Sequence, residues 1–190
     1  MIEPDLILSA YRNGYFPMAD PETKEINWYK PEMRAIFILK DLKLPRSLHQ
    51  LVKKNNFEIT YNQNFKTVIK NCSYRNETWI SKEIISSYLK LHKLGFGFSV
   101  EAWKNTVIVG GLYGIALGGI FFGESMFSKI SGASKVAFAS LVEKLKKQNF
   151  DIIDAQFMNE HLKILGAIEI PQKEYENILT KSLNKYCRFE

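Results

Sequence analysis

Residues 106–123 read TVIVGGLYGIALGGIFFG, eighteen consecutive positions without a charged side chain, and Glu124 follows them directly. An apolar run of this length is buried either in protein or in lipid. It contains six glycines, which weaken a helix, and Gly118 and Gly119 lie midway, where a hairpin would reverse its direction. A membrane-spanning helix with small residues at four-residue spacing is the alternative. We predict two strands joined by a tight turn.

The segments on either side of this run extend the predicted sheet. Alternate positions from Phe96 to Ala102 are apolar, so residues 96–128 are expected to form three antiparallel strands. Downstream, periodicity and glycine stops predict a helix at 133–148, a strand at 151–155, a short helix at 160–165, a strand at 167–170 and a final helix. This order is that of an α+β acyltransferase domain of the GCN5-related kind, by analogy of fold alone.

The first 75 residues predict a smaller α+β unit. Helical spacing begins after Pro4 and stops at Gly14, and two more helices begin near Ser47 and Phe65. Strands are expected at 34–39 and 57–61, and a further helix at 81–94 precedes the three-stranded segment. We therefore predict an α+β fold with a small N-terminal domain over residues 1–75 and an acyltransferase-like catalytic domain over residues 76–190.

The composition is that of a folded globular protein. Of 190 residues, 46% are hydrophobic and 24% are charged, which excludes a disordered chain and a coiled coil. Cys72 and Cys187 have no neighbouring Cys or His at metal-ligand spacing, so we expect no metal site. The acidic start of the chain does not resemble a leader, so we expect a cytoplasmic location without membrane association. A net charge of +6 permits a polyanionic partner, although solvated helix faces explain it equally well.

Two acids and an amide end apolar strands. Asp154 and Gln156 close the strand at 151–155 and share one face of it, while Glu124 closes the long apolar run. Capping of the next helix is a sufficient explanation for Asp154 alone. If the two strands are neighbours, however, both acids enter one hydrophobic cleft beside an amide. That arrangement indicates a site for a cation or an amine.

Other candidate sites are less specific. Residues 129–134 (KISGAS) open the central helix with hydroxyls and lysines, which suits a phosphate, but they match the acetyl-CoA loop imperfectly and N-capping explains them as well. Trp79 lies in a predicted loop and is a candidate for stacking on a base, with a core position as the alternative. The three histidines have no Ser, Cys or Asp partner at a recognisable spacing, which favours surface or capping roles.

Short motifs in a fixed order resemble one known family. They are residues 10–18 (AYRNGYFPM), 28–31 (WYKP), 34–35 (RA), 78–80 (TWI), 91–92 (LH), 99–101 (SVE), 109–114 (VGGLYG), 123–128 (GESMFS), 133–135 (ASK), 154–156 (DAQ) and 165–167 (LGA). Together they are similar to the leucyl/phenylalanyl-tRNA–protein transferases over nearly the whole chain. The resemblance implies transfer of Leu or Phe, and by extension Met, from aminoacyl-tRNA to the N-terminal Arg or Lys of acceptor proteins, which marks them for degradation. No cofactor or metal is implied, because the ester is already activated.

The resemblance also implies roles for individual residues. Asp154 and Gln156 would be the catalytic pair, with Asn159 in their hydrogen-bond network, Asp154 polarising the Gln156 amide, and Glu124 facing an amine. The aminoacyl pocket would be lined by Leu112, Phe121, Met126, Leu141 and Ile153. Trp79 would stack on the terminal adenine, with Met18 where some members have an aromatic residue. Candidates for the tRNA phosphates are Arg12, Lys30, Arg34, Lys129 and Lys135.

Two alternatives remain from the sequence. An acetyl-CoA-dependent N-acetyltransferase would have the same fold, but its phosphate loop is matched imperfectly by residues 129–134. A non-catalytic RNA-binding protein would explain the basic charge and Trp79, but it leaves the two acids and Gln156 without a role.

Overall fold

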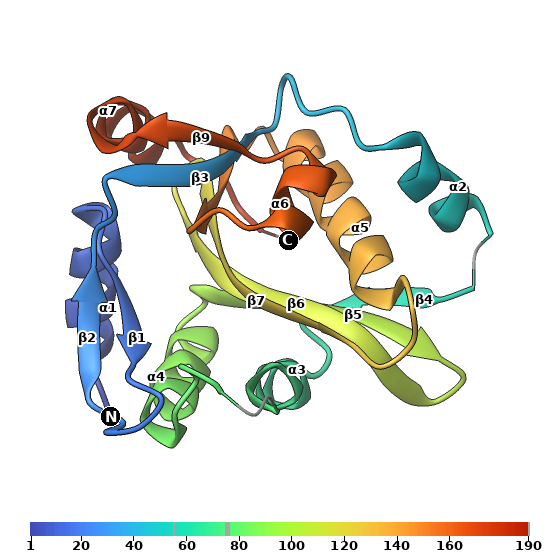
Figure 1. Cartoon of the computed structure of the whole chain (residues 1–190), viewed down its shortest axis with the longest axis horizontal. Helices are drawn as coiled ribbons and strands as arrows, with labels where there is room; N and C mark the ends of the chain where they lie inside the picture. Colours follow the sequence, from blue (N-terminus) through green and yellow to red (C-terminus); the bar gives the residue numbers. More distant parts are fainter. Residues whose placement is uncertain (55, 75–76, 190) are drawn as a thin grey trace.

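The computed structural model describes residues 1–54, 56–74 and 77–189, which form a curved sheet with helices on both faces (Figure 1). The helices are α1 (Pro4–Arg12), α2 (Arg46–Lys53), α3 (Phe65–Ser73), α4 (Lys82–Lys93), α5 (Ala133–Lys147), α6 (Glu160–Leu165) and α7 (Gln172–Leu183). The strands are β1 (Phe16–Ala19), β2 (Ile26–Tyr29), β3 (Met33–Ile38), β4 (Glu58–Tyr61), β5 (Gly97–Lys104), β6 (Val107–Leu117), β7 (Ile120–Ser128), β8 (Ile152–Gln156) and β9 (Ile168–Pro171).

Seven strands make the main sheet in the order β4-β5-β6-β7-β8-β3-β9. Every neighbouring pair is antiparallel except β7 and β8, which are parallel and are connected through α5. A parallel pair needs such a crossover, since a tight turn can only join antiparallel strands. The predicted order of three strands, helix, strand, helix and strand is confirmed, and so is the α+β class.

The apolar run forms β6 and β7, as predicted. Gly118 makes the turn between them with a φ of 55°, a conformation that glycine adopts without strain. A Cβ atom at Gly110 would lie 2.5 Å from the Cβ of Ala133, so the missing side chain lets α5 rest directly on the sheet. Among the described residues, no helix is long and apolar enough to cross a membrane. The helix-dimer interpretation of these glycines is therefore wrong.

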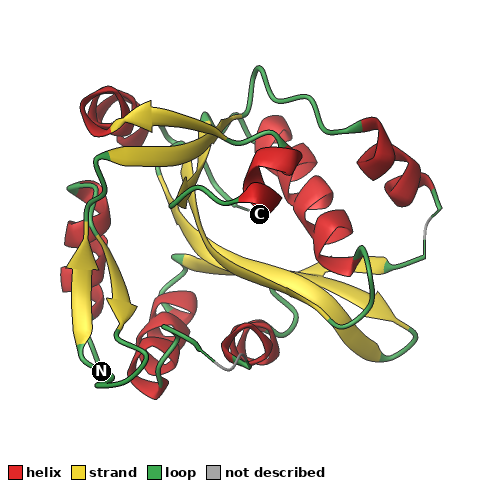
Figure 2. Ribbon diagram, viewed as in Figure 1, coloured by secondary structure: helices red, strands yellow, loops and turns green. Residues whose placement is uncertain are grey.

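Helices lie on both faces of the sheet (Figure 2), and the buried residues form two hydrophobic cores. One core joins α1, α3, α4 and α7, with residues such as Ile7, Val68, Tyr88 and Tyr175 at its centre. The other lies beneath α2, α5 and α6 and contains Phe121, Leu141 and Ile153. Because β7 is buried on both faces, the sequence shows an unbroken apolar run there instead of alternation.

The N-terminal part contributes to the same sheet. β3 lies between β8 and β9, and β4 pairs with the edge of β5. A separate hairpin of β1 and β2, which the sequence did not predict, packs beside α1. The predicted domain boundary falls on Arg75 and Asn76, which lie outside the described residues, and the division stays a prediction.

Candidate active site

The two central strands separate where the candidate residues lie. β7 and β8 pair only from Ile120 with Ile152 to Phe122 with Asp154. Glu124 and Gln156 each come two residues after the last pair, where a cavity of about 590 Å³ opens beside the strands. The strand ends thus bring Glu124 and Gln156 together, as predicted for neighbouring strands, but the prediction that Asp154 enters the same cleft is wrong, because Asp154 is fully buried against Arg34.

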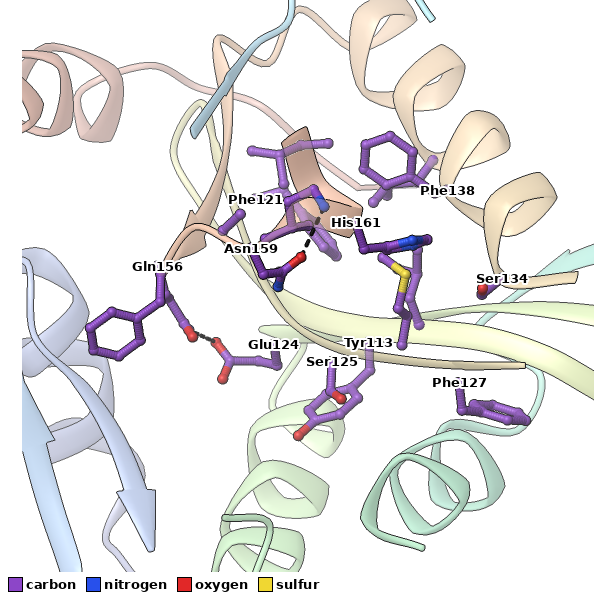
Figure 3. Close-up of a pocket in the computed structure, with 18 of the residues that line it drawn as sticks. Tyr113, Phe121, Glu124, Ser125, Phe127, Ser134, Phe138, Gln156, Asn159 and His161 are labelled. Carbon is purple, nitrogen blue, oxygen red and sulfur yellow. Dashed lines mark hydrogen bonds between the residues drawn. The ribbon is translucent and has the colours of Figure 1, made fainter. Parts of the chain in front are cut away.

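The cavity collects most of the predicted site residues (Figure 3). Its walls include all five predicted aminoacyl-pocket residues, Leu112, Phe121, Met126, Leu141 and Ile153. The proposed adenine contacts Trp79 and Met18 also line it, as do Glu124, Gln156 and Asn159. A largely apolar cavity with a few convergent polar groups is the usual form of a small-molecule site.

Glu124 is a buried acid at the edge of this cavity, with 8% of its surface exposed. Its Oε1 accepts hydrogen bonds from the Tyr11 hydroxyl at 2.5 Å and from Gln156 Nε2 at 3.1 Å, and its Oε2 accepts one from Tyr88 at 3.1 Å. Burial raises the pKa of Glu124 to about 7, although these hydrogen bonds oppose the rise. Glu124 can therefore exchange a proton near neutral pH.

Asp154 lies behind the cavity rather than in its wall. Its carboxylate accepts two hydrogen bonds from Arg34, from Nε at 2.9 Å and Nη2 at 2.7 Å, and one from the Tyr175 hydroxyl at 2.6 Å. Both charged side chains are 0% exposed, and the guanidinium also contacts the rings of Phe16 and Tyr175. Burial alone would lower the pKa of Arg34, but the attraction of Asp154 outweighs it and raises the value. Arg34 and Asp154 therefore form an ion pair that is fully shielded from solvent.

Gln156 connects the two acids. Its backbone N–H donates to Asp154 Oδ1 at 2.9 Å, while its side-chain amide donates to Glu124. The predicted contact between Asp154 and the Gln156 side chain is therefore wrong. Asp154 accepts from the backbone N–H of Gln156, and Glu124 accepts from its side-chain amide. Gln156 has a φ of 65°, which is unusual outside glycine and is typical of residues held in place at functional sites.

Asn159 lines the cavity but has a different partner from the one predicted. Its Oδ1 accepts a hydrogen bond from the backbone N–H of Leu162 at 2.9 Å, so it caps the N-terminus of α6. Capping satisfies one of the amides that a helix start leaves unpaired. Asn159 thus fixes the turn that follows Gln156.

The proposed phosphate contacts are dispersed. Arg34 is removed from this group, because it is fully buried and paired with Asp154. Lys30 forms an ion pair with Glu176 at 2.7 Å, and Arg12 lines a second hollow away from the main cavity. Lys129 is exposed and Lys135 is half-buried at the start of α5. Lys135 is also close enough to His161 in the cavity wall to help burial lower the pKa of that imidazole.

Some residues at this site were not predicted. Tyr11 and Tyr88 come from α1 and α4, and their hydroxyls are 2.6 Å apart beside Glu124. The sequence shows each of them only as a tyrosine on an otherwise apolar helix face. A tyrosine hydroxyl needs a hydrogen-bond partner when it is buried, but the sequence does not say which partner it has. Phe157 also lines the cavity and packs edge-on against Phe16, with ring centres 5.4 Å apart. Nothing in the local sequence indicates that contact.

Residues 129–134 do not favour a pyrophosphate site. The backbone N–H of Ser134, which would face a phosphate, donates to the hydroxyl of Ser128 at 3.2 Å. Gly132 begins the helix with a φ of 86° and lies against Leu51. Over the parts of the chain that the structure describes, no group of three or more His, Cys, Asp or Glu side chains is placed to hold a metal ion.

Comparison with known proteins identifies the family. Residues 22–180 match "Leucyl/phenylalanyl-tRNA protein transferase", and residues 1–32 match its N-terminal domain. The chain belongs to the leucyl/phenylalanyl-tRNA protein transferase family. A leucyl/phenylalanyl-tRNA–protein transferase from Gloeobacter violaceus is 46% identical over 99% of this chain and 97% of its own length. Its counterpart from Prosthecochloris aestuarii is 49% identical over 96% of each chain.

A solved structure with much lower sequence identity has a similar fold. A conserved protein of unknown function from Bacteroides thetaiotaomicron superposes with a TM-score of 0.53 at 14% identity, over 70% of this chain and 53% of its own. That likeness concerns the fold alone. The family resemblance predicted from the short motifs is confirmed, and the acetyl-CoA alternative is not favoured by the relatives.

Proposed function

We propose that this protein transfers Leu or Phe, and by extension Met, from aminoacyl-tRNA to the N-terminal Arg or Lys of acceptor proteins. Family membership supports transfer from tRNA to protein. The observation that carries the proposal is one cavity with an apolar interior and with Glu124 and Gln156 at its edge. The modified proteins would be marked for degradation, and a cytoplasmic location, where charged tRNA is used, is part of the same proposal.

The apolar end of the cavity suits the donor side chain. The cavity wall offers aliphatic and thioether surface from Leu112, Met126 and Leu141. This surface suits side chains that are not branched at Cβ, such as Leu, Met and Phe, and the flexible Met126 can adapt to each of them. A charged or amide side chain would lose its hydration there without a partner, so it is rejected. Trp79 and Met18 line the same cavity and are the proposed contacts of the terminal adenine.

The reaction is aminolysis of an ester. The acceptor's neutral α-amine forms a bond to the aminoacyl carbonyl carbon, the bond from that carbon to the ribose oxygen breaks, and the amine proton ends on the ribose hydroxyl. An α-amine has a pKa near 8, so about nine in ten are protonated at pH 7 and a base is useful. Glu124, with its pKa raised to about 7, is our candidate for that base.

Gln156 would orient the amine rather than remove its proton. Since Nε2 donates to Glu124, the amide carbonyl is the group left to accept a hydrogen bond from the incoming amine. An amide carbonyl is a weak base, but a fixed acceptor aligns the nitrogen for attack. Asp154 and Arg34 would act from behind by holding the Gln156 backbone.

The decisive experiment supplies both substrates to the whole protein. Radiolabelled Leu-tRNA is incubated with an acceptor whose N-terminal residue is Arg, beside the same acceptor beginning with Ser. We expect label in the first acceptor only, and Glu124→Gln to lower transfer strongly while tRNA binding persists. No label in either acceptor, in an assay where an active family member succeeds, would refute the proposal. Tight binding of acetyl-CoA in calorimetry would support the acetyltransferase instead.

A further inference from the structure

Phe189 separates the main cavity from a second hollow. The second hollow has a volume of about 440 Å³, and Phe189 lines it together with Phe98, Leu183 and Arg12. The Phe189 ring also packs on the ring of Phe121, with centres 5.6 Å apart at an angle of 33°. Phe121 lines the main cavity. These two rings, tilted relative to each other, therefore link the walls of the two spaces.

The position of Phe121 depends on what surrounds its ring. A Cβ atom at Gly114 would lie 2.5 Å from Cε1 of Phe121, so the ring occupies the space that a side chain would fill. Its backbone is fixed between Ala116 on β6 and Ile153 on β8. The ring is 0% exposed and forms part of the wall of the main cavity, and Phe189 packs against it.

Phe189 is itself held firmly. It is 7% exposed, and its ring packs on Phe98 with centres 4.6 Å apart. The ammonium of Lys144 on α5 lies 5.3 Å from its ring centre. Four residues earlier, Lys185 donates to the Asn149 carbonyl at 2.7 Å and to Asp151 at 2.6 Å. The segment that carries Phe189 is thus fastened to the residues just before β8, and Ile153 of β8 also lines the cavity.

We propose that Phe189 is a specificity-determining residue that holds Phe121 in place and so limits the size of the donor pocket. The inference rests on the proposed function, because the main cavity is taken as the site of the donor side chain. Phe189 does not line that cavity, so it acts as a positioning residue through Phe121. Without its ring, Phe121 can tilt toward the second hollow, and the pocket enlarges at its apolar end. A larger pocket favours Phe over Leu, since Leu then loses wall contacts that the bigger ring keeps.

The test measures donor choice in one enzyme preparation. The kcat/KM values for Phe-tRNA and Leu-tRNA are determined with an N-terminal Arg acceptor for wild type, Phe189→Ala and Phe189→Leu. The ratio of the two values is independent of the fraction of folded enzyme, so a loss of stability does not mimic the effect. We expect Phe189→Ala to raise the Phe/Leu ratio about tenfold and Phe189→Leu to raise it by a smaller factor.

Tyr186→Ala is the matched control on the same segment, because Tyr186 is 80% exposed. Its Phe/Leu ratio is expected to equal that of wild type. An unchanged ratio in both Phe189 variants, or an equal shift in Tyr186→Ala, would overturn the inference. Complete loss of transfer in both Phe189 variants would overturn it too, since a role limited to pocket size leaves the reacting groups intact. A wild-type protein that transfers neither residue would instead refute the proposed function, and this inference with it.

Discussion

Replacing Asp154 with Ala is expected to destabilise the fold more than it alters the chemistry. The change removes a carboxylate that accepts from two Arg34 nitrogens, the Tyr175 hydroxyl and the Gln156 backbone. Arg34 is 0% exposed and would remain buried without its counter-charge. Breaking a buried pair in this way typically lowers the free energy of unfolding by about 3–5 kcal/mol. That is a large share of the stability of a domain of this size.

Denaturant unfolding followed by circular dichroism measures the effect. Asp151→Ala is the matched control, because Asp151 also forms an ion pair, with Lys185 at 2.6 Å, but its side chain is 37% exposed. An exposed pair contributes about 0–1 kcal/mol, and the hydrogen bond that Asp151 accepts from Ser182 contributes about 1 kcal/mol more, so the control should lose much less stability than Asp154→Ala. A double variant, Arg34→Met with Asp154→Leu, removes both charges and should recover part of the lost stability.

The transfer assay separates a supporting role from a direct one. If Asp154 acts mainly by stabilising the fold, the activity lost in Asp154→Ala should be partly regained in the double variant as the fold recovers. An Asp154→Ala protein with wild-type stability and no transfer would refute this reasoning. Asp154 would then have to reach the substrate itself.

Three further predictions concern the cavity. The pKa of Glu124 is raised from 4.5 to about 7, so the folded protein keeps a proton that the unfolded chain releases, and stability should fall by about 3 kcal/mol as pH rises through that range. Glu124→Gln should abolish this slope in unfolding experiments, and an unchanged slope would contradict the assignment. Trp79→Ala should weaken binding of an aminoacyl-adenosine analogue by about 1–3 kcal/mol in calorimetry, whereas unaltered binding would remove Trp79 from the adenine site. Phe157→Ala, at a ring that is 44% exposed, should raise the KM for the acceptor protein and leave binding of that analogue intact; the reverse pattern would place Phe157 in the donor site.

Much of the second half of the fold was predictable because its signals are local. The turn at Gly118, the helix of α6 with its Gly166 end and the alternation before Ala102 all follow from neighbouring residues. The aminoacyl-pocket residues were located by resemblance to a family, not by physical reasoning from spacing. Their convergence on one cavity still supports that transfer of roles.

The rest depended on contacts between distant segments. Arg34 had the sequence profile of a surface cation, and only the insertion of β3 between β8 and β9 places it against Asp154, 120 residues later. Likewise, Tyr11 meets Glu124 across 113 residues. A periodic pattern states which face of an element is buried, but it does not state which element covers that face.

The site is assembled from segments that are far apart in the sequence, and this has a consequence for protein synthesis. Tyr11, which contacts Glu124, leaves the ribosome well before Tyr175, which contacts Asp154, because the two lie far apart along the chain. A nascent chain that has not yet released α7 lacks one of the partners of Asp154, so we expect it to hold Gln156 poorly. Activity should therefore appear only after α7 has left the ribosome. Prematurely terminated chains should be unstable and open to proteolysis rather than become transferases of altered specificity.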